Sequence, residues 1–508
     1  MNGRVASNVI WNWAGMGVSM LAGFVLAPYL VHTLGDSVYG LWILIASMTG
    51  YFGLLDLGVR GSVGRYIAYY RARGEQSQVN AILSTAVAIL SGVAVLALLA
   101  TGCVLLVFFH LFDVPADQVA AARLAIVLVG VNFALTFPVS VFDGVLWGQE
   151  RFDLINAIDI PTAVVRLGLT FWLVRGAGDI VTLAWITLGT TAANELIKLG
   201  ASFHVDRRLR MSPWLFSRAQ AAQLFGYGLW QFLLQIARQV SGQIGPLLIG
   251  GVVSVAAVTP FSIASRLLAY ASQFAVAATG VLTPMATRLH ARDDHVRERR
   301  LFVEGGRWCM AFALYASIML IGFGGPLLRL WMGQKLAAIS LPQLTVLTMG
   351  ETLAISQWLT YSIILGKARH RAVAIASLVE GVVAGVGGFY AARFWGPMGI
   401  CVVFAVAAFG CRGVFQIVQA CRVLRVPVGD YIRGALVPPI AAAVLPALVL
   451  WATLWWRGPV TWVELFTYGS AFSVLYAGVA MVFLGGLQYL PRRWFAVVGQ
   501  PAVERFHG

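Results

Sequence analysis

Long apolar stretches alternate with short polar connections along almost the whole chain. About 20 apolar residues suffice for a helix to cross a bilayer, so each stretch predicts one membrane span. The predicted fold is therefore an all-α polytopic membrane protein. We predict fourteen spans, at residues 8–31, 38–60, 80–109, 122–146, 159–175, 180–204, 222–249, 252–285, 307–329, 341–366, 372–393, 397–420, 434–456 and 463–488.

The seventh and eighth spans carry more polar side chains than a lipid-facing helix tolerates. Four glutamines recur at every fourth residue, which places them on one helical face: Gln231, Gln235, Gln239 and Gln243. Arg238 lies beside this stripe, and Arg266 lies on the next span. A cation in hydrocarbon costs from about 2.5 to more than ~10 kcal/mol, so we expect both arginines to face a hydrated or protein-lined interior.

Composition and charge exclude a soluble protein and indicate an orientation. Of the 508 residues, 59% are hydrophobic and 11% are charged, and the formal charge is +15. Lys and Arg cluster in alternate connections, which is a topology signal rather than a nucleic-acid site. The asymmetry places both termini in the cytoplasm of a multi-pass protein, with no nucleic-acid partner.

Cysteine usage and loop lengths limit the chemistry that the chain can perform. The five cysteines fall within or at the ends of apolar spans without a CxxC pair, so we expect no disulfide framework, metal site or cofactor. The outward connections are short and leave no domain for catalysis. We therefore expect a transporter rather than an enzyme.

A weak internal repeat supports two halves of six spans. An ungapped shift of 218 residues aligns Pro28, Leu30, Ile45, Ala46 and Ser47 with Pro246, Leu248, Ile263, Ala264 and Ser265. Halves that are six spans apart share their orientation, as in transporters with parallel repeats. The predicted parts are a bundle at 1–204, a cytoplasmic linker at 205–221 that can form a surface helix, a bundle at 222–420, and spans 13 and 14 with a tail at 421–508.

Several stretches resemble a known family. They are LAPYLVHTLGDSVYGLW (26–42), YFGLLDLGV (51–59), VLWGQERFDLINAID (145–159) and LRLWMG (328–333). These stretches are similar to polysaccharide-transport flippases of the multidrug/oligosaccharidyl-lipid/polysaccharide exporter superfamily. The resemblance implies two six-helix bundles around a central cavity that opens alternately to each side, lined by spans 1, 2, 7 and 8.

The same resemblance implies a substrate and a place in the cell. Such flippases move undecaprenyl-pyrophosphate-linked oligosaccharides, for example O-antigen or exopolysaccharide repeat units, across the bacterial inner membrane. We expect this function for a monomer in membrane lipid, with a glycan polymerase or ligase of the same pathway as a further partner. The alternatives are a cation-coupled multidrug exporter, a lipid II flippase, and a membrane glycan polymerase or ligase.

The candidate substrate-binding residues follow from the polar stripe. Arg238 and Arg266 can bind a pyrophosphate through their guanidinium groups, or can form structural ion pairs with Glu351 or Glu195. The four glutamines can bind sugar hydroxyls, or can form hydrogen bonds between helices. Asn12 on the first span can extend the polar lining, or can serve an interfacial or capping role.

Other charged residues suggest gating and coupling. Asp56 and Arg60 can form a helical i,i+4 pair, or can belong to a gate with Arg65, Arg288 and Arg292. Glu195 and Lys198, three residues apart, are expected to neutralise each other. Glu351 and Glu380 have no nearby partner in the sequence and are candidate coupling-ion or proton sites. Arg166 and Arg412 are expected to be structural or to snorkel toward the interface rather than to bind a ligand.

Overall fold

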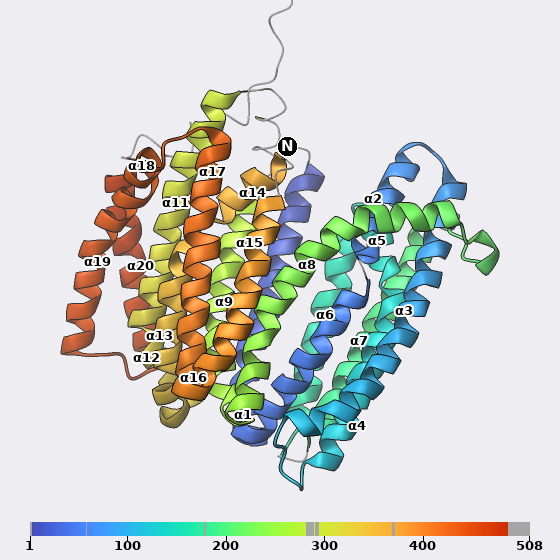
Figure 1. Cartoon of the computed structure of the whole chain (residues 1–508), viewed down its shortest axis with the longest axis horizontal. Helices are drawn as coiled ribbons and strands as arrows, with labels where there is room; N and C mark the ends of the chain where they lie inside the picture. Colours follow the sequence, from blue (N-terminus) through green and yellow to red (C-terminus); the bar gives the residue numbers. More distant parts are fainter. Residues whose placement is uncertain are drawn as a thin grey trace, which may run out of the picture. The chain divides into compact units, whose positions relative to one another are not determined.

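Helices account for every regular element that the computed structural model describes, which covers residues 3–56, 58–176, 179–280, 289, 294–367 and 371–485 (Figure 1). Ten helical segments in these ranges are long and apolar enough to cross a membrane. The predicted all-α polytopic class is thus confirmed, while the total of fourteen spans stays a prediction. Helix α1 (Gly3–Gly50) contains the first predicted span and part of the second, joined at Gly35 with φ 81°.

Contacts divide the chain into two compact units. The first comprises Met1–Arg266 with Ala374–Phe404, and the second comprises Leu267–Val373 with Ala405–Gly508. This division does not follow the predicted boundary near residues 205–221, because α8 (Arg218–Val252) packs against α1 within the first unit. The two bundles inferred from the repeat stay a prediction.

The first unit is built on long helices that pack side by side. Helix α4 lies between α3 and α7, and α6 packs against α1 and α7 (Figure 1). Helix α8 contacts α2 and α3 as well as α1. The further helices of this unit are η1 (Tyr51–Asp56), α2 (Val59–Ala72), α3 (Gln76–Leu111), α4 (Val119–Val139), α5 (Val141–Gly148), α6 (Phe152–Leu173) and α7 (Ile180–Val205), with the first part of α9 (Val258–Gly280).

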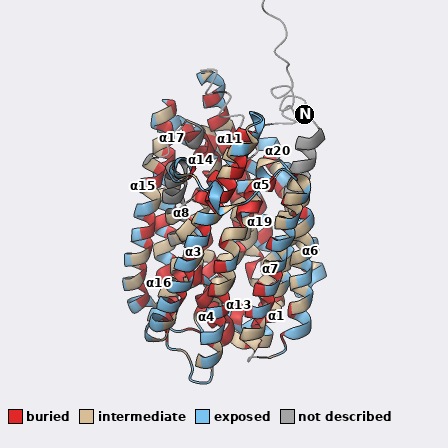
Figure 2. Ribbon diagram, turned by 90° about the vertical axis from the view of Figure 1, so that its right-hand side faces the viewer, coloured by how far each residue is buried: buried red, intermediate tan, exposed pale blue. Residues whose placement is uncertain are grey.

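Burial in this unit follows one face of each helix. On α3, Leu90 and Ala97 are fully buried, whereas Leu99 is 63% and Leu106 is 74% exposed. Figure 2 shows the same alternation of buried and exposed positions along neighbouring helices. Leucines exposed to this extent along a 36-residue helix are expected where lipid, rather than water, covers the outer face.

The polar connection predicted at residues 60–80 contains a helix that the sequence reading missed. Helix α2 buries Val59, Val63 and Ile67, four residues apart, and leaves Arg60 and Arg65 exposed. Its arginines lower the local hydropathy, so a search for apolar spans passes over it. The predicted linker at 205–221 contains a short turn at Pro213–Leu215 in place of a separate surface helix. Helix α8 begins within it at Arg218, with Ser217 as its N-cap.

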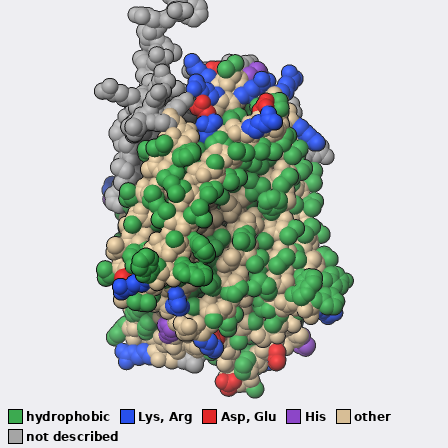
Figure 3. Space-filling view, turned by 90° about the vertical axis from the view of Figure 1, so that its left-hand side faces the viewer, with side chains coloured by type: hydrophobic (Ala, Val, Ile, Leu, Met, Phe, Trp, Pro, Cys, Tyr) green, Lys and Arg blue, Asp and Glu red, His purple; other side chains and the backbone are tan. Residues whose placement is uncertain are grey.

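The second unit centres on α11, which packs against α13 and α19. Its outer surface is apolar: on α19, Val444 is 52%, Leu448 is 56% and Trp455 is 80% exposed. Figure 3 shows hydrophobic side chains across the middle of one face and Lys and Arg toward its ends. The helices are α11 (His295–Gly322), α12 (Gly324–Met332), α13 (Gln334–Ser356), α14 (Trp358–Gly366), η5 (Ala408–Phe415), α17 (Gln416–Leu424), α18 (Val428–Tyr431), η6 (Ile432–Leu436), α19 (Val437–Trp456) and α20 (Trp462–Leu484).

The first unit also contains a later stretch of the chain, residues 374–404. Helices α15 (Arg371–Val382), η4 (Val383–Gly387) and α16 (Gly388–Ala407) carry the predicted eleventh span and the start of the twelfth. Gly396, with φ 57° and ψ −147°, reverses the chain inside α16, as Gly35 does in α1.

Candidate functional site

The described part of the glutamine stripe on α8 faces the end of α1. Gln239 Nε2 donates a hydrogen bond to the Gly50 carbonyl oxygen at 2.8 Å. A Cβ added at Gly50 would lie 3.2 Å from Gln239 Nε2 and 3.3 Å from Gln243 Nε2, so both amides point at this glycine. Gln239 therefore makes a helix-to-helix bond in this conformation, and a role toward sugar stays a proposal.

Four predicted binding residues fall outside the described side chains: Gln231, Gln235, Arg238 and Asn12.

Arg266 on α9 is half-buried and keeps its binding groups available. Within the described ranges, no carboxylate lies at ion-pair distance from its guanidinium, and no hydrogen bond engages it. One helical turn earlier, the buried Ser262 hydroxyl also has no hydrogen-bond partner. Two unused donors on one helical face suit an anionic ligand with several oxygen atoms.

The alternative partners of Arg266 are engaged elsewhere or lie apart from it. The Glu351 carboxylate forms a two-point ion pair with Arg412, with one of its two contacts at 2.9 Å. Glu195 forms no ion pair with any described residue. The structural ion pairs considered for Arg266 are therefore absent from the described part of the protein.

Helix α1 packs closely against the end of α8 and the start of α9. Thr259 Oγ1 donates to the Asp36 carbonyl oxygen at 2.7 Å. A Cβ at Gly40 would lie 2.3 Å from the Val255 carbonyl oxygen, and a Cβ at Gly250 would lie 2.5 Å from Leu44 Cδ2. At Gly40 the neighbour is backbone, which leaves no room for a side chain, whereas a side chain at Gly250 would require Leu44 to move.

A cavity of about 440 Å³ lies beside this contact, between the end of α3 and the end of α8. Its wall combines backbone at Gly250 and Gly251 with the side chains of His110, Asp113 and Ser254. The tight α1–α8 contact therefore borders a polar recess at the same end of the first unit.

The residues predicted to form a gate have other partners. Asp56 Oδ1 accepts a hydrogen bond from the Gly58 amide at 2.7 Å, and the left-handed Gly58 (φ 77°) separates η1 from α2. The expected i,i+4 pair is therefore wrong, because Asp56 and Arg60 are not on one helix. Arg60 pairs with Asp143 at 2.9 Å. Arg65 is exposed, with its guanidinium 5.9 Å from the Tyr66 ring centre.

Arg288 and Arg292, the remaining residues of the predicted gate, lie outside the described residues.

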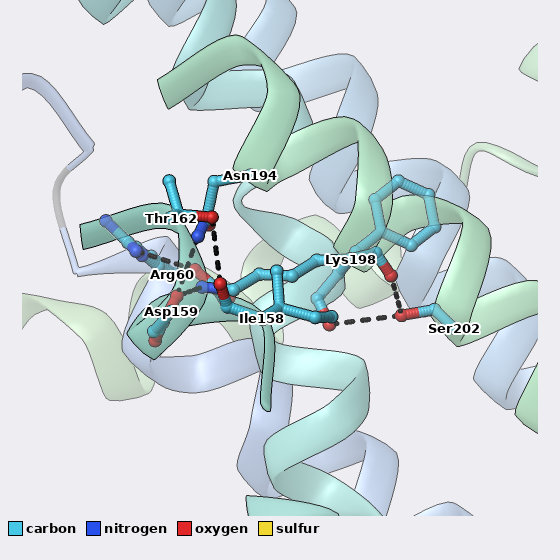
Figure 4. A network of polar contacts seen from close by, with 9 residues as sticks. Arg60, Ile158, Asp159, Thr162, Asn194, Lys198 and Ser202 are labelled. Carbon is cyan, nitrogen blue, oxygen red and sulfur yellow. Dashed lines mark hydrogen bonds and ion pairs between the residues drawn. The ribbon is translucent and has the colours of Figure 1, made fainter. Parts of the chain in front are cut away.

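A charged network at the same end of the first unit joins Lys198, one of the charged residues noted in the sequence, to two aspartates that were not predicted to belong to a site (Figure 4). The Lys198 ammonium lies 2.8 Å from Asp143 Oδ1 and 2.8 Å from Asp159 Oδ1. Asn194 Nδ2 donates to Asp159 Oδ1 at 2.9 Å. The expected Glu195–Lys198 pair is not formed, because Lys198 binds the two aspartates of α5 and α6 instead. For Asp159 the sequence offered one indication, because this residue is the last of the family-like stretch at 145–159.

The remaining intramembrane charges have structural contacts. Arg166 donates to the hydroxyls of Thr190 and Thr191, at 2.8 Å each, and so joins α6 to α7. Arg412 joins η5 to α13 through Glu351. Both agree with the expected structural roles. Glu380 is 4% exposed on α15 and has interactions of its own.

Comparisons with known proteins agree on a family and a fold. Residues 5–290 match the family described as "Polysaccharide biosynthesis protein". EpsK, an uncharacterized membrane protein of Bacillus subtilis (strain 168), is 23% identical over 476 residues, which cover 90% of this chain and 91% of that protein. A provisionally named O-antigen transporter of Shigella flexneri is 20% identical over 351 residues, which cover 68% of this chain and 81% of that one.

The fold is that of a solved flippase. The structure of the lipid II flippase MurJ in an inward closed conformation aligns with 94% of this chain and 98% of its own, with a TM-score of 0.70 and 12% sequence identity. At this identity the likeness shows the fold alone.

Proposed function

Because the chain belongs to the family of polysaccharide biosynthesis proteins, we propose that it is a flippase for a lipid-linked oligosaccharide. The substrate is an undecaprenyl-pyrophosphate-linked repeat unit, carried from the inner to the outer leaflet of the bacterial cytoplasmic membrane. Family membership carries this proposal, and it confirms the resemblance that the sequence motifs indicated. The name of the O-antigen relative supports the class of substrate.

In this mechanism Arg266 binds the pyrophosphate. Its guanidinium and the Ser262 hydroxyl are donors without a partner in the described protein, and together they offer hydrogen bonds to phosphate oxygens. Arg238, predicted on the neighbouring span, adds a second positive charge.

The glutamines of α8 bind the sugar in this proposal, with Asn12 extending the polar lining. Moving a saccharide through hydrocarbon without hydrogen-bond partners is prohibitive, and amides supply both donors and acceptors. The bond from Gln239 to Gly50 is then one that substrate hydroxyls replace.

Alternating access requires the α1–α8 contact to open. The helices pack closely at Gly40 and Gly250, near the predicted outer end, and in this proposal release to the outer leaflet separates them. We propose that Asp56, Arg60 and Arg65, with Arg288 and Arg292, act at the predicted inner end. Glu351 and Glu380 are proposed coupling-ion or proton sites, and Glu351 reaches that role only if its pair with Arg412 opens.

The proposal also covers the oligomeric state, the orientation and the partners of the protein. We infer a monomeric, non-enzymatic transporter whose two termini are cytoplasmic, and which hands its glycan to a polymerase or ligase of the same pathway. The positive-inside asymmetry of the sequence supports the orientation.

The test uses purified protein in proteoliposomes with a fluorescent undecaprenyl-pyrophosphate oligosaccharide. We expect wild type to move the lipid between leaflets and Arg266→Ala to lower the rate at least ~10-fold, since one charged hydrogen bond contributes about 1.5–3 kcal/mol. Arg266→Lys, which keeps the charge without the planar fork, is expected to fall between them. Arg123→Ala, an exposed arginine of α4, is the matched control.

Other outcomes would identify a different protein. Covalent change of the substrate would favour a glycan polymerase or ligase. Efflux of cationic drugs that survives Arg266→Ala, without glycan movement, would favour a multidrug exporter. Movement of lipid II alone would narrow the substrate to the peptidoglycan precursor.

A further inference from the structure

Three carboxylates and two cations meet where α5, α6 and α7 pack beside the start of α2. The acidic cluster consists of Asp143 on α5, Asp159 on α6 and Glu195 on α7. Lys198 bridges the two aspartates, and Arg60 binds the second oxygen of Asp143 at 2.9 Å. All five side chains belong to the first unit.

Glu195 differs from the two aspartates in its burial and in its lack of a partner. It is 7% exposed, and its Oε2 atom is buried without a hydrogen-bond donor. The side chains whose charges act on it are Asp143, Lys198, Arg60 and Asp159. Both cations are directed at the aspartates, and neither makes an ion pair with the Glu195 carboxylate in the described structure.

The charges of this cluster do not balance unless one more positive charge is present. With every group ionised, the three carboxylates exceed Arg60 and Lys198 by one negative charge. Burying an uncompensated charge is costly, and a carboxyl group in that position is most stable when neutral. One bound proton gives the cluster a net charge of zero.

A metal ion fits this cluster poorly. Oxygen-bound cations need several ligand atoms around one centre. The position between Asp143 and Asp159 already holds the Lys198 ammonium, and Asn194 donates to the same oxygen of Asp159. No three His, Cys, Asp or Glu side chains in the described ranges are arranged to hold a metal.

We propose that Glu195 is a proton-binding site, and that loss of its proton transfers Lys198 from the two aspartates to Glu195. Residues three apart on a helix are neighbours, so an ionised Glu195 competes for the Lys198 ammonium within α7. That exchange releases the two 2.8 Å contacts that join α7 to α5 and α6. The proton thereby controls how tightly these helices are held. Coupling of this switch to glycan movement rests on the proposed function.

Infrared difference spectroscopy of the purified full-length protein tests the site directly. We expect wild type to show a carbonyl band, from the buried and protonated Glu195 carboxyl group, that disappears as pH rises. Glu195→Gln is expected to lose this band, and Glu195→Asp to shift it, because the shorter side chain keeps a carboxyl in place. Glu304→Gln, at an exposed glutamate paired with Arg300, is the control and should keep the wild-type band.

The proposal is overturned if the band survives in Glu195→Gln or if wild type shows none. Should Glu195→Gln fail to fold, the Glu195→Asp shift decides the question, and an unshifted band there overturns the site equally.

A transport assay separates the site from the proposed function. In proteoliposomes, an imposed proton gradient should change the rate of glycan movement by wild type, and Glu195→Gln should lose that dependence. Movement by wild type that ignores the gradient refutes coupling but leaves the flippase intact. A titrating Glu195 band in a protein that moves no glycan refutes the flippase and retains the proton site.

Discussion

Charged side chains within the membrane spans of this protein are held by partners that are distant in sequence. Glu351 and Arg412 are 61 residues apart, and Lys198 is 55 residues from Asp143. Apolar periodicity identifies the helices, but it does not state which faces meet. For that reason the residues that carry charge were predictable, whereas their pairing was not. Arg266 was recognised because a cation in a span is rare wherever it points.

The pair between Glu351 and Arg412 gives a prediction at this scale. We expect Glu351→Gln to lower the free energy of unfolding by about 1–3 kcal/mol, because it removes the two-point ion pair between Glu351 and the Arg412 guanidinium. This range is below that for a fully buried pair, since the Arg412 side chain is 36% exposed. Denaturant unfolding in detergent measures the change.

The double variant Glu351→Gln/Arg412→Gln separates structure from coupling. We expect it to recover more than half of the lost stability, as both charges are then absent. Additive losses would contradict a structural pair. A stable double variant that no longer transports would favour Glu351 as a coupling-ion site.

At the scale of elements, each predicted span is mostly helical where the structure describes it, because runs of about 20 apolar residues have few other solutions in a membrane. The boundaries differ by several residues, as at 253–257, which the eighth predicted span includes but which lie between α8 and α9. The prediction missed a helix where polar residues lower the local hydropathy. Helix α2 was hidden by its arginines. The reversal at Gly35, by contrast, lies within the connection predicted between residues 31 and 38.

Glycine at helix crossings gives the second prediction. A Cβ at Gly350 of α13 would lie 2.3 Å from Ala405 Cα and 2.4 Å from its carbonyl oxygen. Since backbone atoms cannot move aside as a side chain can, Gly350→Ala should destabilise the protein by about 1–3 kcal/mol. The thermal unfolding midpoint in detergent checks this.

Gly410 in η5 supplies the matched control, because nothing lies within 4 Å of its added Cβ. There, alanine should leave stability unchanged or raise it by up to ~1 kcal/mol through its better helix propensity. Equal effects at the two glycines would mean that α13 and α16 are not in backbone contact.

At the scale of the whole molecule, the proposed transport cycle requires α1 to leave α8 at the predicted outer end. A Cβ at Gly250 would lie 3.2 Å from Leu44 Cγ, the atom whose place a cysteine sulfur at position 44 would take, so we expect cysteines at these two positions to be close enough to form a disulfide. In the double variant the Leu44 methyl groups that would block a residue at 250 are absent. Oxidation of Leu44→Cys/Gly250→Cys should therefore form the bond, visible by mass spectrometry of the linked peptides, and should stop glycan movement in proteoliposomes. Reduction should restore it.

The single variant Leu44→Cys, treated with the same oxidant, accounts for the five native cysteines. If the oxidised double variant moves glycan at the wild-type rate, these helices do not part during transport, and the route to the outer leaflet must open elsewhere. If no bond forms, α1 and α8 are not in contact there. A cross-linked protein that binds substrate but does not release it would show that transport stops after binding. This is the expected result if the substrate reaches Arg266 from the inner side while the outer end cannot open.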